Sequence, residues 1–127
     1  MKLKLISWEF AVYKIDKTVD ISEYIKNQEC VFLWITPNEV SVTIASEVKI
    51  SHYINKIDWW KIFELQGIFE FSESNVWITA KLSGILAEAG VSLCFVGTHD
   101  TDYIMVSAYD LTLAISAFEA KWIEIIY

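Results

Sequence analysis

The chain has 127 residues, of which 54% are hydrophobic, and its ten basic against seventeen acidic residues give a formal net charge of −7. This length fits one ordinary domain or two small lobes, and the many aromatic and few Gly and Pro residues exclude a disordered chain. The acidic balance excludes nucleic acid as a partner. No apolar run reaches the roughly 18 residues that span a bilayer, which excludes a membrane-spanning protein.

The N-terminus and the cysteines indicate a cytoplasmic protein. Leu3 and Leu5 alternate with lysines, which is typical of a strand and not of a signal peptide. Cys30 and Cys94 are too few for a disulfide scaffold, and both lie in apolar runs where a reduced thiol acts as a small hydrophobic group.

The first half of the chain predicts strands, one short helix and a hairpin. Period-two alternation over residues 2–15 predicts one strand broken near Ser7, or two short strands. Residues 20–26 predict a helix with Asp20 as its N-cap. The run 31–45 predicts a hairpin around the turn Thr-Pro-Asn-Glu at 36–39.

The middle of the chain predicts a change of lobe. The polar, weakly periodic residues 46–58 are typical of a connection, and residues 59–65 predict a new strand. An amphipathic helix is expected to begin near Ser72 or Ser74 and to end at Gly90. Gly84 inside this helix suggests close packing against a sheet.

The remaining pattern completes a ferredoxin-like order. Residues 91–96 and 103–106 predict strands that flank a polar tip, and Asp110 is expected to cap a helix over 111–121. The last residues, 122–126, predict either a strand or a ragged continuation of the helix. The second half therefore has the order βαββαβ.

Two strand–turn–strand segments also match each other. Residues 32–45 align with residues 94–107 at a constant offset, so that Thr36 falls on Thr98 and Asn38 on Asp100. The chain is interpreted as two copies of one unit, the first abbreviated.

The sequence holds no catalytic signature, and we expect no enzyme. His52 and His99 are the only histidines, and no Ser or Cys has the context of a nucleophile. His99, Asp100 and Asp102 could converge on a metal ion, but without paired metal-ligand spacing a solvated turn is the better interpretation. No glycine-rich phosphate loop is present, so neither a metal nor a cofactor is expected.

A small-molecule site is expected where the helix start and the hairpin tip meet. The positive end of the helix near residues 74–77 suits a carboxylate, and the carboxylates of Glu73 and Asp102 suit an ammonium or guanidinium group. An α-amino acid carries both groups. The structural alternative is that Glu73 only favours the helix dipole and Asp102 only solvates a turn.

Three motifs resemble the small tandem ACT-domain proteins related to the CASTOR arginine sensors and their bacterial counterparts. They are GIFEFS at residues 67–72, LAEAGVS at 86–92 and GTHDTDYIMV at 97–106. The sequence departs from the family pattern at Ile68, where Pro is usual, and at Asn75, where Gly is usual.

The resemblance implies an α+β fold of two tandem ferredoxin-like ACT lobes packed side by side, with lobes at residues 1–58 and 59–127. It implies an amino acid held between the lobes, with Thr36, Asn38 or Ser46 as the contribution of the first lobe. Taken together, the motifs and the resemblance give a set of candidate ligand-binding residues: Phe71, Ser72, Glu73, Ser74, Asn75, Val76, Trp77, Thr98, His99 and Asp102.

The leading hypothesis is therefore a non-catalytic amino-acid sensor or regulatory protein, with a homodimer as its default assembly. The alternative is a protein–protein interaction or dimerisation module that kept the fold and lost the pocket, because edge strands and surface aromatics suit an interface.

Overall fold

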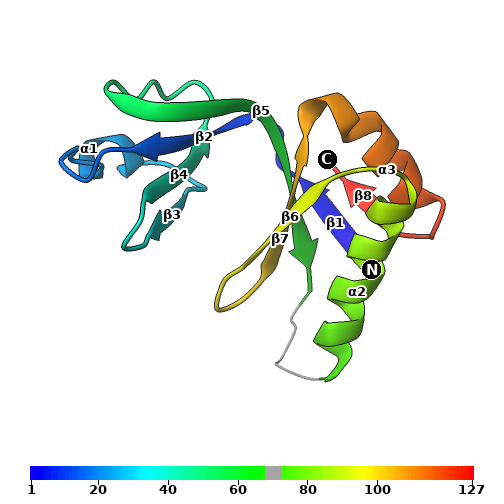
Figure 1. Cartoon of the computed structure of the whole chain (residues 1–127). Coiled ribbons are helices and arrows are strands. Elements are labelled where there is room, and N and C mark those ends of the chain that lie inside the picture. Colours follow the sequence, from blue (N-terminus) through cyan, green and yellow to red (C-terminus); the bar gives the residue numbers. More distant parts are fainter. Residues whose placement is uncertain (68–72) are drawn as a thin grey trace. The chain divides into compact units, whose positions relative to one another are not determined.

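The computed structural model describes residues 1–67 and 73–127, and the chain forms two compact units. The terminal unit comprises Met1–Ser7 and Lys61–Tyr127, and the central unit comprises Trp8–Trp60. The long strand β5 (Tyr53–Gln66) contributes residues to both units (Figure 1). The lobe boundary expected between residues 58 and 59 falls inside this strand.

The central unit is built on an antiparallel sheet in the order β3-β4-β2-β5, of which β5 contributes its first half. The predicted hairpin is confirmed, because β3 (Phe32–Ile35) pairs along its whole length with the first four residues of β4 (Val40–Ala45). Its turn is closed by a 2.9 Å hydrogen bond from the Thr36 amide to the Glu39 carbonyl.

One face of this sheet carries the core of the central unit. Every second residue of β2 (Phe10–Ile15) belongs to this core. The side chains of Ala11, Tyr13 and Ile15 are each at most 2% exposed. They pack with Val42 and Ile44 of β4. The buried row therefore fixes the register of β2 against β4, since a slip of one residue would expose it.

The short helix α1 (Ser22–Ile25) begins later than the sequence suggested. Its N-cap is Ile21, and Asp20 is not the cap. Asp20 instead accepts hydrogen bonds from the Ser22 amide at 3.0 Å and the Ser22 hydroxyl at 2.6 Å, which is an Asx turn before the helix.

Residues 46–58 were predicted to be a connection, and this is wrong for the second part of the segment. Residues 53–58 already belong to β5. The side chains of Tyr53, Ile54 and Ile57 are about half exposed or more. An edge strand with exposed apolar residues lacks the hydrophobic alternation by which strands are recognised, which explains the error.

The terminal unit has the strand order β8-β1-β5-β7-β6. Its elements β5, α2 (Glu73–Glu88), β6 (Leu93–Gly97), β7 (Asp102–Ser107), α3 (Leu111–Glu119) and β8 (Glu124–Ile126) confirm the predicted βαββαβ order. The N-terminal strand β1 (Lys2–Leu5) inserts between β8 and β5, parallel to the first and antiparallel to the second. Residues assigned from sequence to the first lobe thus complete the sheet of the terminal unit.

Both long helices pack on one face of this sheet and confirm the predicted apolar faces. Leu82 and Leu86 of α2 and Ala114 and Phe118 of α3 are fully buried in one cluster with β1, β5 and β7. The ring of Phe118 meets that of Phe63 edge-on, with centroids 5.5 Å apart. This cluster holds the helices against the strands that carry the candidate site.

Gly90 ends α2 with a φ of +76°, as expected. The expectation for Gly84 is wrong: no described heavy atom lies within 4 Å of a Cβ placed there. Neither cysteine forms a disulfide, but Cys94 is exposed and Cys30 is half-buried outside the strands, so neither lies in a core.

Candidate functional site

The hairpin between β6 and β7 carries the best-defined part of the candidate site. The Thr98 amide donates to the Thr101 carbonyl at 2.9 Å, and the Thr101 amide donates to the Thr98 hydroxyl at 3.2 Å. Thr36 and Glu39 form the same pattern in the central unit, where the Glu39 amide donates to the Thr36 hydroxyl at 3.1 Å. The internal match noted in the sequence is therefore repeated in turn geometry.

A side-chain hydrogen bond anchors this tip to the neighbouring strand. The Thr101 hydroxyl donates to the Leu65 carbonyl at 2.9 Å in a partly buried position. Leu65 lies near the end of β5, shortly before Gly67, whose φ of +121° turns the chain away from the strand. The tip is thereby held at the point where the chain leaves β5 toward α2.

Asp102 lies at the base of the tip, paired with Gly97. Its carboxylate oxygen Oδ1 is 3.3 Å from the position that a Cβ on Gly97 would take, so glycine leaves room for this carboxylate. The side chain is half-buried and lies at the start of β7.

The other predicted residues of the tip are arranged differently. His99 and Asp100 are almost fully exposed, and the His99 Nδ1 atom lies 2.6 Å from Asp100 Oδ1. The Thr98 hydroxyl donates to the Thr101 carbonyl at 3.0 Å. Thr98 therefore supports the turn, while His99 and Asp100 project into solvent.

The helix side of the predicted site is only partly described. Phe71 and Ser72 lie outside the described residues. Glu73, Ser74, Asn75 and Val76 form the first turn of α2, and their side chains also lie outside the described part. Trp77, the next residue of the helix, is 75% exposed. Within the described residues, then, the structure brings together the hairpin tip and the end of β5.

Three residues of the central unit were predicted as possible ligand contacts from the first lobe. Thr36 and Asn38 belong to the β3–β4 turn, where the Asn38 amide donates to the Thr36 hydroxyl at 3.3 Å. The Ser46 hydroxyl is buried, and it has no hydrogen-bond partner in the described part of the chain.

The sequence interpretation missed Thr101 and Gly97. The sequence placed Thr101 in the polar hairpin tip without a role of its own, although its hydroxyl joins the tip to the end of β5. The available signal was the spacing of Thr98 and Thr101, which is typical of a turn closed by a threonine hydroxyl. The pairing of Gly97 with Asp102 depends on strand register and had no local signal.

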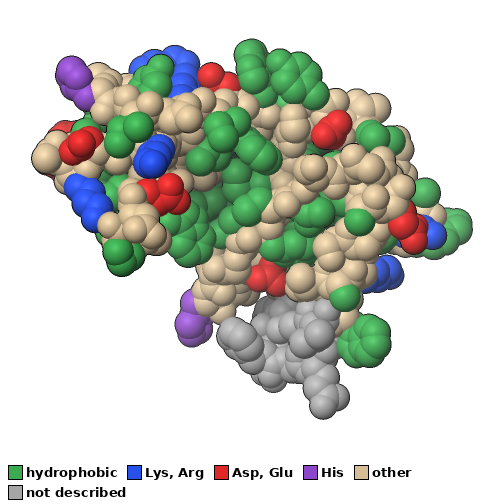
Figure 2. All heavy atoms as spheres, viewed as in Figure 1, with side chains coloured by type: hydrophobic (Ala, Val, Ile, Leu, Met, Phe, Trp, Pro, Cys, Tyr) green, Lys and Arg blue, Asp and Glu red, His purple; other side chains and the backbone are tan. Residues whose placement is uncertain are grey.

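One face of the protein shows no concentration of one charge. On the face shown in Figure 2, acidic and basic side chains are interspersed with hydrophobic ones. Among the described residues no group of three or more His, Cys, Asp or Glu side chains could hold a metal ion. No helix in the same residues is both long and apolar enough to cross a membrane.

Comparison with known families and structures places the fold. Residues 57–120 match the family described as ACT domain. A protein from Agobacterium tumefaciens has a similar crystal structure, with a TM-score of 0.86 at 20% identity over 98% of this chain and 91% of that one. No curated protein matches the sequence.

Two other solved structures are similar at lower scores. A protein of unknown function from Vibrio cholerae, described as a possible transport protein, gives a TM-score of 0.66 at 16% identity over 91% of this chain and 84% of that one. The regulatory subunit of aspartate kinase from Thermus thermophilus, in a ligand-free form, gives a TM-score of 0.61 at 10% identity over 91% of this chain and 95% of that one. At these identities the likeness concerns the fold alone.

Proposed function

Because the chain belongs to the ACT domain family, we propose that it is a non-catalytic regulatory protein that binds a free amino acid between its two lobes. We take the lobes as residues 1–58 and 59–127, and the protein as a cytoplasmic homodimer.

The observation that carries the proposal is the Thr101–Leu65 hydrogen bond, which holds the hairpin tip beside the end of β5. A ligand site needs side chains held in place before the ligand arrives, because ordering them at binding weakens affinity. Asp102 lies next to Thr101 at the start of β7, so the backbone that carries its carboxylate is held by the same bond and by the pairing with Gly97.

Each charged group of an amino acid has a proposed partner. The ammonium group would be bound by the carboxylates of Asp102 and Glu73. The carboxylate would be bound by the backbone amides at the start of α2, a helix of 16 residues. Phe71, Ser72, Ser74, Asn75, Val76, Trp77, Thr98 and His99 complete the proposed contacts.

The experiment is thermal unfolding of the protein with each common amino acid at millimolar concentration. A ligand at 100 times its Kd adds about 2.7 kcal/mol of stability, which raises the Tm of a domain of this size by several degrees. No shift with any amino acid would overturn the proposal.

Matched variants locate the site. Asp102→Asn keeps the shape of the side chain and removes its charge, so the ligand-induced shift should disappear. Asp100→Asn is the control, since Asp100 lies at the same tip but is 91% exposed and contacts His99. Equal loss of the shift in both variants would contradict a specific role for Asp102.

A second candidate is an interaction module without a ligand. It is favoured by large apolar side chains on the surface of the terminal unit, among them Tyr109, Trp122 and Tyr127, each at least 79% exposed. Assembly that persists in Asp102→Asn, with no amino acid changing the Tm of the unaltered protein, would support this candidate.

A further inference from the structure

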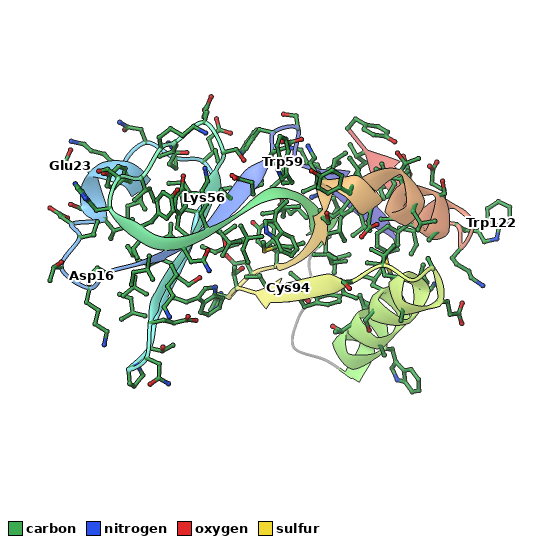
Figure 3. All side chains as sticks on the ribbon, turned by 45° about the horizontal axis from the view of Figure 1, so that its top comes forward. Asp16, Glu23, Lys56, Trp59, Cys94 and Trp122 are labelled. Atoms are coloured by element: carbon green, nitrogen blue, oxygen red, sulfur yellow. The ribbon has the colours of Figure 1, made fainter. Side chains whose placement is uncertain are left out.

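Strand β6 ends on a glycine that its backbone conformation does not require. Gly97 is the last residue of this strand, which Cys94 marks in Figure 3, and it lies opposite Asp102 in the ladder with β7. The described glycines with a left-handed φ are Gly67 and Gly90, and Gly97 is not one of them. Glycine in a strand lowers stability relative to a residue with a side chain. The reason for this glycine therefore lies in the space around it.

The central unit holds a matched turn that has no glycine at this place. The alignment of the two hairpins places Ile35 on Gly97 and Val40 on Asp102, and Ile35 pairs with Val40 as Gly97 pairs with Asp102. Both turns are closed by the same backbone hydrogen bond, which is 2.9 Å long in each. Ile35 nevertheless carries a full side chain, which is 71% exposed. The turn geometry therefore does not need glycine at position 97.

The space that a side chain of Gly97 would fill lies beside one carboxylate. The Asp102 Oδ1 atom is 3.3 Å from the position of a Cβ on Gly97, and no other described heavy atom lies within 4 Å of that position. Gly97 is exposed and Asp102 is half-buried. Within the described residues the Asp102 carboxylate forms no hydrogen bond or ion pair. We call this space the Gly97 niche, an opening beside a carboxylate that has no partner in the described chain.

The Gly97 niche lies on the face of the sheet that carries the helices. Phe95 packs against the core cluster shared by α2 and α3, and Gly97, two residues further along β6, belongs to the same face. On β7 the buried Ile104 belongs to that cluster, so Asp102 shares its face as well. Ile78, near the start of α2, packs against the cluster too. The carboxylate and the start of α2 therefore lie on the same side of the sheet.

We propose that Gly97 determines the specificity of the amino-acid site, because its niche receives the ammonium group of the ligand beside Asp102. The inference rests on the proposed function and deepens it. An ammonium group is compact and has three donors, so it can approach the carboxylate across a strand that lacks a side chain. Glycine within a strand is typical of a place where a ligand comes close to the backbone.

The same geometry defines which ligands are excluded. A methyl group on Gly97 would lie 3.3 Å from Asp102 Oδ1, at the place where the ammonium group approaches. A substituent on the ligand nitrogen needs the same space. The site is therefore selective for a free, unsubstituted ammonium group, and an N-acetyl amino acid, which also lacks the positive charge, does not bind.

The test is isothermal titration calorimetry with two probes: the L-amino acid that raises the Tm of the unaltered protein in the panel above, and its N-acetyl form. The variants are Gly97→Ala and Asp102→Glu, with Ile35→Ala as the control, because Ile35 has the matched place in the other turn. Asp102→Glu keeps the negative charge and lengthens the side chain, so that its own carboxylate can fill the Gly97 niche. Thermal unfolding without ligand shows whether each variant keeps its stability.

Gly97→Ala and Asp102→Glu should each weaken binding of the amino acid by at least about tenfold, because a charge-assisted contact of its ammonium group is lost. Ile35→Ala should bind with unaltered affinity, and the N-acetyl form should bind to none of the proteins. Without ligand, the Tm of Gly97→Ala should be unchanged or higher, because alanine replaces glycine in a strand and the Asp102 side chain can rotate away from the methyl group.

Failure of this inference can be distinguished from failure of the proposed function. Unaltered affinity of Gly97→Ala, or equally tight binding of the N-acetyl form, overturns the inference and leaves an amino-acid sensor standing. An unaltered protein that responds to no amino acid overturns both. A lower Tm of Gly97→Ala without ligand, together with undiminished binding by Asp102→Glu, shows that the glycine serves the fold and also overturns the inference.

Discussion

The Thr101 hydroxyl donates a 2.9 Å hydrogen bond to the Leu65 carbonyl and joins the tip of one hairpin to the end of another strand. The two residues are 36 positions apart in the sequence. The bond links the segment that carries Asp102 to the segment that leads into α2, so changes at Thr101 should affect both stability and ligand binding.

We expect Thr101→Val to lower the free energy of unfolding by about 1 kcal/mol, the usual net value of one hydrogen bond, because the Leu65 carbonyl loses its donor. Thr101→Ser keeps the hydroxyl and should retain most of the stability. Urea unfolding of the three proteins measures this difference. Equal destabilisation by Val and Ser would mean that the methyl group, and not the hydroxyl, supports the tip.

The two described helix glycines of the terminal unit should respond in opposite directions to alanine. Gly84→Ala should raise stability by about 1 kcal/mol, because Gly84 lies inside α2 and no described atom outside the helix lies within 4 Å of the added Cβ. Gly90→Ala should lower it by about 1–2 kcal/mol, because the left-handed conformation strains any Cβ even though space is open around it. Thermal and urea unfolding would check both signs, and a destabilising Gly84→Ala would reveal a contact there.

Phe118→Ala should be the most damaging single truncation on α3. Phe118 is fully buried and meets the ring of Phe63 edge-on, so its loss leaves a cavity that costs about 3–5 kcal/mol. The exposed Leu113 on the same helix is the control, since surface substitutions usually stay within about 0.5 kcal/mol. Urea unfolding followed by tryptophan fluorescence reports both. A small effect of Phe118→Ala would mean that the cluster collapses around the gap.

Asp20 should make stability fall in acid. The hydrogen bond from the Ser22 hydroxyl, followed by that from the Ser22 amide, holds the pKa of this carboxyl below its ordinary value of 3.8. The folded state binds the proton less readily than the unfolded state, so the contribution of Asp20 is complete above the ordinary pKa and is lost as the pH falls through the lower folded value. Asp20→Asn should therefore reduce the acid dependence.

Thermal unfolding across the acidic range tests this pH dependence. Asp16 is held in the same way by the Thr18 hydroxyl and amide, and its pKa is lowered too. The double variant Asp16→Asn with Asp20→Asn should show a weaker dependence than either single variant. Identical pH profiles in the variants and the unaltered protein would contradict the assignment.

Much of the local structure follows from the sequence alone. The alternation in β2, the turn after Ile35, the apolar faces of α2 and α3 and the left-handed Gly90 each depend on residues within a few positions of one another. Such signals act through backbone preference and hydrophobic periodicity, which do not require knowledge of distant partners. The motifs of the second half also sufficed to indicate the ACT family.

Other features depend on contacts between distant segments. The first half of β5 shows no alternation because its side chains lie exposed on an edge, and the insertion of β1 beside β8 joins opposite ends of the chain. Neither the Thr101–Leu65 bond nor the proximity of Asp102 to Gly97 has a local signal, because both depend on strand register.

The sequence by itself determined most of the elements, the order of the second half and the family of this protein, since hydrophobic period and turn chemistry act over short distances. Only the tertiary structure decided which strands are neighbours, which threonine anchors the hairpin tip, and that the left-handed residue after α3 is an exposed tryptophan. These facts arise from long-range pairing and from burial, which depend on the whole chain and not on any segment of it.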